Sequence, residues 1–257
     1  MSLFVPQFQI VSDLHLETPV TSPEYASFSL KTHCSNLLLL GDIGLVKDDG
    51  LFQFLRGLLS KDRGIRIFYV LGNHESYQLS FSQCLQRIRD FEKEAQLDFA
   101  GRFIFLHRNR YDVDKSITIL GCTLWTAVST EQSTEVAARL TDFNERRGIV
   151  DWTLDQHLEE HRKDTQWLNA EVESLQLNEP HRQIIVLTHH GPTKDARAID
   201  NQHRGSSVSS GFVSDLSDQP CWTSPSVRLW AFGHTHYSCA FHDEQTGKLV
   251  VSNQKGY

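Results

Sequence analysis

An α/β fold is the first expectation for this chain, and it rests on three observations. Five short runs rich in leucine or β-branched residues have the composition of strands buried on both faces. Segments with the apolar spacing of helices lie between several of these runs. The 257 residues contain no long Pro/Gly/Ser linker, so we predict a single domain over residues 1–257. The five runs occupy residues 8–15, 36–42, 65–75, 183–190 and 227–236.

The elements that follow the first strand are expected to alternate between strand and helix. A polar loop over residues 16–35 leads to the second strand. Helices are predicted over residues 51–61, 81–95 and 152–176, where apolar residues recur at helical spacing. The third helix is expected to pack one face on a sheet.

The strands in the second half of the chain are expected to pair with their neighbours in sequence. Residues 103–107 and 116–125 are predicted as adjacent antiparallel strands across the turn-like segment 108–115. Residues 239–253 are predicted as a hairpin. The serine-rich stretch 195–220 has no periodicity and lies between two of the apolar runs, so we expect a lid loop there.

The charge of the chain limits the classes of partner. The net charge is -7 and the Lys and Arg residues are scattered, so no long nucleic acid is expected as a partner. A small phosphorylated substrate is compatible with this charge, because bound divalent cations would reverse the local field. The oligomeric state is not indicated by the sequence.

The cysteine content and the apolar runs predict a compartment. The five cysteines are odd in number and show no CxxC spacing, which is typical of reduced thiols in an intracellular protein. No basic leader precedes the first run, and no run approaches the roughly 18 residues of a membrane span. We therefore expect a cytoplasmic or nuclear protein without a membrane partner.

Residues of metal-ligand type stand at the end of each apolar run. Ligands collect outside the carboxyl ends of strands in layered α/β folds, so these side chains are expected to converge. Carboxylate, imidazole and amide donors suit hard or borderline divalent cations, whereas structural zinc sites use clustered cysteines. A single histidine at a strand end is more often structural, so the argument depends on the five blocks together. They are Asp13 and His15, Asp42, Asn73 and His74, His189 and His190, and His234 and His236.

These blocks together resemble the signature of the calcineurin-like metallophosphoesterases. DLH at 13–15, GD at 41–42, GNHE at 72–75, THH at 188–190 and GHTH at 233–236 occur in the order found in that family. The resemblance implies a four-layer αββα sandwich of two mixed β-sheets flanked by helices. It also implies hydrolysis of phosphate esters by in-line attack of a metal-bound hydroxide.

The resemblance implies two divalent metal ions, with manganese as the expected metal in vitro and iron or zinc as alternatives. Asp42 would bridge both ions and is thereby counted with the catalytic residues. His189 is favoured over His190 as a ligand because it directly follows the strand, which leaves His190 to pack or to contact substrate. The implied ligands are Asp13, His15 and His236 for one metal, and Asn73, His189 and His234 for the other.

His74 is the second implied catalytic residue. In the family the histidine of this motif faces the phosphate and stabilises its charge or protonates the leaving group. Protein phosphatases of the family carry GDxxDR, but here Leu45 and Val46 follow GDIG, so a phosphoprotein phosphatase is disfavoured. The candidate substrate contacts are Asn73, His74, His190 and Arg204, with a solvated loop arginine as the alternative for Arg204. Weaker candidates near the pocket, each also explained as a cap or packing residue, are Tyr77, Asp142, Asn144 and Asn253.

The function expected from these features is phosphodiester hydrolysis on a small or nucleotide-like substrate, with cyclic nucleotides among the candidates. One alternative is a phosphomonoesterase that acts on a small metabolite. The other is a non-catalytic scaffold that binds a protein. A scaffold would be expected to have lost ligands, whereas all seven implied ligands and His74 are present.

Overall fold

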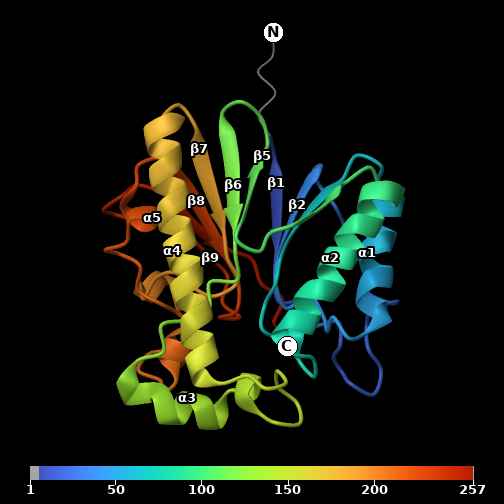
Figure 1. The fold of residues 1–257 in the computed structure, drawn as a ribbon, viewed down its shortest axis with the longest axis horizontal. Helices are drawn as coiled ribbons and strands as arrows, with labels where there is room; N and C mark the ends of the chain where they lie inside the picture. The colour runs from blue at the N-terminus through green and yellow to red at the C-terminus, as the bar shows by residue number, and fades with distance from the viewer. Residues whose placement is uncertain (1–5, 257) are drawn as a thin grey trace.

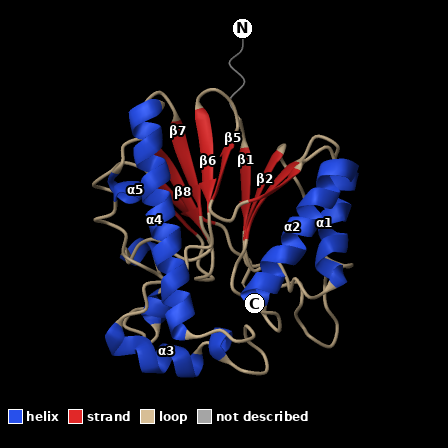
Figure 2. Ribbon diagram, in the orientation of Figure 1, coloured by secondary structure: helices blue, strands red, loops and turns tan. Residues whose placement is uncertain are grey.

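Two β-sheets pack face to face and helices cover their outer faces in the computed structural model, which describes residues 6–256 (Figures 1 and 2). The core has three main apolar layers: helices against the first sheet, sheet against sheet, and the second sheet against helices. The predicted αββα sandwich is confirmed.

The first sheet contains four parallel strands in the order β1-β2-β3-β4. Helices α1 (Asp49–Lys61) and α2 (Phe81–Asp98) pack on its outer face. In β2, Leu37 and Leu39 pack in the helix layer, whereas Leu38 and Leu40 pack between the sheets. This burial on both faces explains the uninterrupted leucine run. The strands are β1 (Phe8–Val11), β2 (Asn36–Leu40), β3 (Arg66–Val70) and β4 (Phe103–Phe105).

The second sheet contains six strands in the order β5-β6-β7-β8-β10-β9. Four of them are parallel, and β5 and β9 pair antiparallel at the edges, so the predicted C-terminal hairpin is confirmed. Helices α4 (Leu154–Asn178) and α5 (Pro220–Thr223) pack on the outer face. The strands are β5 (Asn109–Asp112), β6 (Ile117–Gly121), β7 (Gln183–Leu187), β8 (Val227–Phe232), β9 (Cys239–His242) and β10 (Leu249–Ser252).

The two longest helices begin with capping boxes. The side chain of Ser80 accepts a hydrogen bond from the N–H of Gln83 in α2, and Thr153 does the same with Gln156 in α4. All three predicted helices are present, with ends shifted by a few residues. Within residues 6–256 no helix has both the length and the apolar character needed to cross a membrane.

The predicted pairing of residues 103–107 with 116–125 is wrong. Strand β4 joins the first sheet beside β3, whereas β6 lies in the second sheet beside β7. The antiparallel partner of β6 is β5, which lies inside the segment expected as a turn. Alternate side chains of β4 explain the difference, because Phe103 and Phe105 pack in the helix layer while Ile104 packs between the sheets.

Two irregular segments contact each other through hydrogen bonds. We call residues 126–152 the cap; it contains α3 (Ser133–Arg139), which is too short to produce a periodic signal. The lid predicted at 195–220 is largely irregular, and Gln132 and Arg139 of the cap hydrogen-bond to Ser206, Ser207, Ser209 and Ser210 within it. The 3-10 turns are η1 (His74–Ser76), η2 (Thr130–Gln132), η3 (Thr141–Phe143), η4 (Ala196–Ala198), η5 (Asn201–His203) and η6 (Ser209–Gly211).

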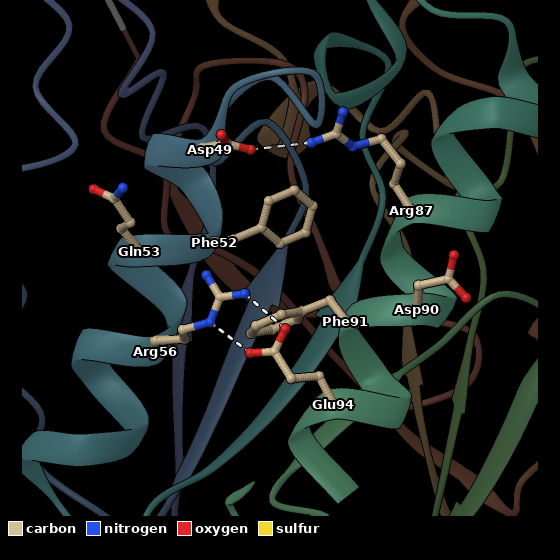
Figure 3. Close-up of a pocket in the computed structure, with 8 residues that line it drawn as sticks. All are labelled: Asp49, Phe52, Gln53, Arg56, Arg87, Asp90, Phe91 and Glu94. Carbon is tan, nitrogen blue, oxygen red and sulfur yellow. Dashed lines mark hydrogen bonds and ion pairs between the residues drawn. The ribbon is translucent and has the colours of Figure 1, made fainter. Parts of the chain in front are cut away.

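A surface groove of about 500 Å³ lies between α1 and α2 (Figure 3). Both of its arginines are paired within the groove: Arg56 binds Glu94 through two hydrogen bonds of 2.5 and 2.7 Å, and Arg87 binds Asp49 at 3.2 Å. Both arginines also lie over phenylalanine rings of the neighbouring helix. We assign this groove to helix packing.

Candidate metal centre

The predicted ligands lie in five loops that leave the carboxyl ends of β1, β2, β3, β7 and β8. Parallel pairing within each sheet brings these ends to one edge, on the side of the molecule where α3 and the C-terminal end lie (Figure 1). Most of the predicted ligands are buried, with at most 7% exposure, whereas the side chain of His236 is 30% exposed. Five strand ends therefore form one polar cluster inside the protein.

The backbone at these loops is unusual. Ten non-glycine residues between 6 and 256 have a positive φ, and five of them are predicted ligands: Asp13, His15, Asp42, His234 and His236. This left-handed conformation costs about 1–2 kcal/mol for an L-residue. Such strain persists where the surrounding structure imposes it, which is typical of functional sites.

Glycines of two motifs allow the loops to approach one another. A Cβ on Gly72 of GNHE would lie 2.1 Å from Oδ1 of Asp42, and a Cβ on Gly233 of GHTH would lie 2.0 Å from Oγ of Ser12. Neither position has room for a side chain. The motif glycines are therefore explained by close packing of ligand loops.

One set of ligands, which we call the first metal group, comprises Asp13, His15 and His236. The Nε2 atoms of His15 and His236 are 2.9 Å apart. Oδ1 of Asp13 lies 3.4 Å from Nε2 of His236 and 3.9 Å from Nε2 of His15. The three donors converge on one point, as a metal site requires.

The second metal group comprises Asn73, His189 and His234. Nε2 of His189 lies 3.1 Å from Oδ1 of Asn73 and 3.1 Å from Nδ1 of His234. Nδ1 of His189 is 2.8 Å from the carbonyl oxygen of Leu40. A carbonyl can only accept, so Nδ1–H donates and the lone pair of a neutral His189 lies on Nε2, facing the other ligands.

Asp42 lies between the two groups. Its Oδ1 is 3.5 Å from Nε2 of His189, and its Oδ2 is 3.9 Å from Nε2 of His15. The backbone N–H of His74 also donates to Oδ1 at 2.9 Å. Each carboxylate oxygen therefore faces a different group, which is the arrangement that a bridging ligand needs.

Glu17 is a functional residue that the sequence reasoning missed. Its Oε1 is 2.9 Å from Nδ1 of His74 and 3.3 Å from Nδ1 of His15. A carboxylate only accepts, so both Nδ1–H groups donate to it and both Nε2 atoms turn toward the site. The only sequence signal of Glu17 is its place two residues after DLH.

The electrostatic field at the cluster favours positive charge. Burial opposes a positive charge on His189 and on His74. At His189 the charge of Asp42 outweighs burial and raises the pKa to about 10. At His74 the charges of Asp42 and Glu17 outweigh burial and raise the pKa to about 9. Burial would also raise the pKa of Asp42, but His189 and His74 outweigh it and hold that pKa well below its usual range. Divalent cations would supply the positive charge that these carboxylates attract, and the carboxylate, imidazole and amide donors fit them.

Glu75, the last residue of GNHE, joins two ligand loops. Its carboxylate accepts hydrogen bonds from the backbone N–H groups of Asp42, Ile43 and Gly72, each at 2.9 Å, and from the hydroxyl of Tyr69 at 2.8 Å. Burial, together with the neighbouring charge of Asp42, raises the pKa of Glu75 to about 7. Glu75 therefore fixes the loop that carries Asp42.

His190 and Arg204 are not members of either ligand group: His190 packs behind the second metal group, and Arg204 lies in the lid. The structure places the fully buried ring of His190 against Trp125 and His234, which matches the packing alternative for this residue. Burial and the charges of His234 and His189 lower the pKa of His190 well below its usual value. Arg204 is exposed in the lid and donates to the carbonyl of Ala196 at 2.8 Å. Contact of either residue with substrate stays a prediction.

The weaker candidates divide into two kinds. Asn144 accepts from the N–H groups of Arg146 and Arg147 and so stabilises a turn. Asp142 and Tyr77 instead contact Asn73 directly. In the C-terminal segment the side chain of Gln254 reaches a ligand loop, where its Oε1 accepts from the N–H of His236 at 2.6 Å, whereas the side chain of Asn253 donates to the carbonyl of Ile10.

The lid contributes a wall to the second metal group. The ring of Phe212 stacks on His234 with centroids 4.9 Å apart. Backbone hydrogen bonds join Gly191 to Phe212 and Ser214, so this part of the lid is fixed to the loop that carries His189. Part of the predicted lid is therefore packed against the loop that carries His189.

Comparisons with known proteins agree with this geometry. A family model described as calcineurin-like phosphoesterase matches residues 8–238. An uncharacterized protein of Acanthamoeba polyphaga mimivirus is 28% identical over 240 residues, which cover 86% of this chain and 78% of that protein.

Two solved structures share the fold. Phosphopantetheinyl hydrolase from Mycobacterium tuberculosis superposes with a TM-score of 0.67 at 14% identity, covering 98% of this chain and 90% of that chain. A dimetal phosphatase from Danio rerio gives a TM-score of 0.51 at 14% identity, covering 95% and 86%. At this level of identity the likeness concerns the fold.

Proposed function

The chain belongs to the calcineurin-like phosphoesterase family, and on that premise we propose that it is a metal-dependent phosphodiesterase for small or nucleotide-like substrates. The family and the ligand groups indicate a phosphoric ester hydrolase with a dinuclear divalent metal centre. The preference for diesters and the choice of manganese are our proposal.

The two metal groups and Asp42 would hold the two cations. When bound, the cations activate water and neutralise charge on the phosphate. The protein's own contribution is to fix the donors: Leu40 and Glu17 set the imidazole orientations, and Glu75 fixes the Asp42 loop. This preorganisation lowers the cost of assembling the charged site.

His74 is the residue positioned to act on substrate. Its side chain is partly exposed, Glu17 holds its Nδ1–H, and its Nε2 lies 3.9 Å from Oδ2 of Asp42. In this position Nε2 can donate a hydrogen bond to a phosphate oxygen or a proton to the leaving group. Glu17 keeps the ring in the orientation that this role requires.

The diester proposal rests on the lack, within residues 6–256, of an arginine or lysine paired with the carboxylates Asp13, Asp42 and Glu17. Leu45 and Val46, where protein phosphatases carry Asp and Arg, are buried in the apolar core. Within residues 6–256, the ion pairs of Asp13, Asp42 and Glu17 are all with histidines. A doubly charged monoester gains most from a bidentate arginine, so a singly charged diester loses less without one.

The test compares an aryl phosphodiester with the corresponding aryl monoester, in the presence of manganese. We expect a higher kcat/KM for the diester and negligible activity on phosphoserine peptides. A monoester preference of tenfold or more, about 1.4 kcal/mol, would overturn the proposal and favour a phosphomonoesterase that uses Arg204. Bound metal without turnover of any ester, cyclic nucleotides included, would favour the protein-binding scaffold.

A further inference from the structure

The carboxamide of Asn73 is held at both ends. Its Oδ1 faces His189, whereas its Nδ2 donates to Oδ1 of Asp142 at 2.7 Å and to the hydroxyl of Tyr77 at 2.9 Å. The hydroxyl of Tyr77 in turn donates to the same oxygen of Asp142 at 2.7 Å. Asn73, Tyr77 and Asp142 thus form a closed triangle.

The directions of these hydrogen bonds are determined by the carboxylate. An ionised Asp142 only accepts, so the Tyr77 hydroxyl proton is committed to it and a Tyr77 lone pair faces Asn73. Both groups that surround the outer end of the carboxamide are therefore acceptors, and only an NH₂ group satisfies them. A flipped amide would place its oxygen against two acceptors and its N–H groups against the metal ligands.

The triangle is isolated from water, which strengthens this preference. The exposed fractions of Asn73, Tyr77 and Asp142 are 4%, 6% and 1%. Hydrogen bonds of charged groups are worth more at low dielectric, and a misdirected amide there costs more. Oδ2 of Asp142 has no hydrogen-bond partner within residues 6–256, so simple packing does not explain this buried carboxylate.

The cap holds Asp142 in place. Asp142 lies in η3, and its carbonyl accepts from the N–H of Ile149 at 3.0 Å. Backbone hydrogen bonds join Gln78 to Gly148 and Val150 to Leu79, directly after the GNHE loop. A Cβ on Gly148 would lie 2.1 Å from the carbonyl oxygen of Thr141, so the loop is closed tightly.

We propose that Asp142 is a positioning residue that sets the orientation of the Asn73 carboxamide and thereby the metal affinity of the second metal group. The inference rests on the proposed function only in taking Asn73 as a metal ligand. It links the cap, 69 residues away in sequence, to one half of the metal centre.

The test compares Asp142→Leu with Asp142→Asn. Leucine has a similar shape and no acceptor, so Asn73 loses its orientation; we expect one metal per chain, bound at the first metal group, and a 10- to 100-fold weaker second site, a range of about the size seen for residues that orient ligands. Asparagine retains an oxygen that can accept from both Asn73 and Tyr77, so we expect two metals. The readouts are elemental analysis, titration with manganese, and anomalous diffraction at the metal edge.

A double variant keeps the test decisive if Asp142→Leu alone folds poorly. Asn73→Asp presents oxygen at both ends and places one oxygen against the Asp142 carboxylate, so adding Asp142→Leu in that background removes a repulsion and should leave the second site as strong as in Asn73→Asp alone or stronger, instead of 10- to 100-fold weaker. Equal loss of the second metal in Asp142→Asn and Asp142→Leu would overturn the proposal, as would two tightly bound metals in Asp142→Leu. These metal readouts do not depend on turnover, so a failure of the diester proposal would leave them unaffected.

Discussion

The two metal groups use similar ligands but have different surroundings. The first metal group opens to solvent through His236, and Gln254 of the C-terminal segment holds the loop that carries it. The second metal group is enclosed by His190, Phe212 and the cap. Ligand chemistry alone would make the two sites alike, so access to water and the residues behind the ligands must distinguish them.

The largest effect is expected at Asp42, because this ligand is shared by the two metal groups that are compared. Asp42→Asn should remove metal from both groups and reduce kcat/KM by at least about 10³-fold, because one charge serves both cations. Elemental analysis and diester kinetics check this. Asp49→Asn, on the exposed surface of α1, is the matched control and should behave as wild type. Loss of only one metal would show that Asp42 does not bridge.

His74 tests whether catalysis can be separated from metal binding. His74→Ala should retain both metals and reduce kcat by about 10²–10⁴-fold, the usual range for a general acid or base. Kinetics and metal content measured on the same preparation check the prediction. Loss of metal together with activity would show that His74 supports the site structurally.

The free energy of unfolding should depend on pH through His157, which is buried behind the second metal group. Burial, together with the charge of His161, lowers the pKa of His157 to about 3. The unfolded chain therefore binds more protons below pH 6.5, and stability falls as the pH decreases toward 3. Between pH 7 and pH 5 this one histidine should reduce the free energy of unfolding by about 2 kcal/mol.

Denaturant unfolding of the metal-free protein at the two pH values measures this loss. His157→Gln does not titrate and retains an acceptor for the N–H of Thr126. The loss between pH 7 and pH 5 should therefore be smaller in the variant by about the same 2 kcal/mol. An unchanged loss would assign the acid sensitivity to other groups.

The smallest effect is expected at the support of the first metal group. Gln254→Ala removes three hydrogen bonds to the GHTH loop, to His236, Thr235 and Tyr237. Manganese should bind up to about tenfold more weakly at the first group and unchanged at the second, as measured by titration. Asn253→Ala is the control, since Asn253 donates to Ile10 instead. Equal weakening at both groups would contradict the comparison.

The strands that carry ligands could be predicted from the sequence because their signals are local. The leucine run of β2 and its terminal Asp42 lie within seven consecutive residues, 36–42, and burial on two faces dictates such a run. Strand pairing was less accessible, because the short β4 and β5 carry too few residues to show which sheet they join. The placement of β4 depended on alternate packing in two separate layers.

The supporting residues of the metal centre were largely missed in this way. Glu17 and Gln254 were not identified, and Asp142 was named only as a weaker candidate near the pocket. All three occupy irregular segments without motif or periodicity, and each acts by a hydrogen bond to a ligand loop. The choice of His189 for the second metal group was suggested by its place after the strand. The structure brings His189 to Asn73 because Leu40 of the other sheet orients its ring.

By itself the sequence determined an α/β fold and the five loops that carry ligand-type side chains, because strand burial and ligand chemistry are properties of short segments; the αββα class followed from the family resemblance of the motifs in those loops. Only the tertiary structure decided which oxygen and nitrogen atoms face one another. Hydrogen-bond direction depends on groups that are distant in the chain, such as Asp142 and Asn73, which lie 69 residues apart. Folding alone brings such groups within the distance of about 3 Å at which a lone pair is assigned.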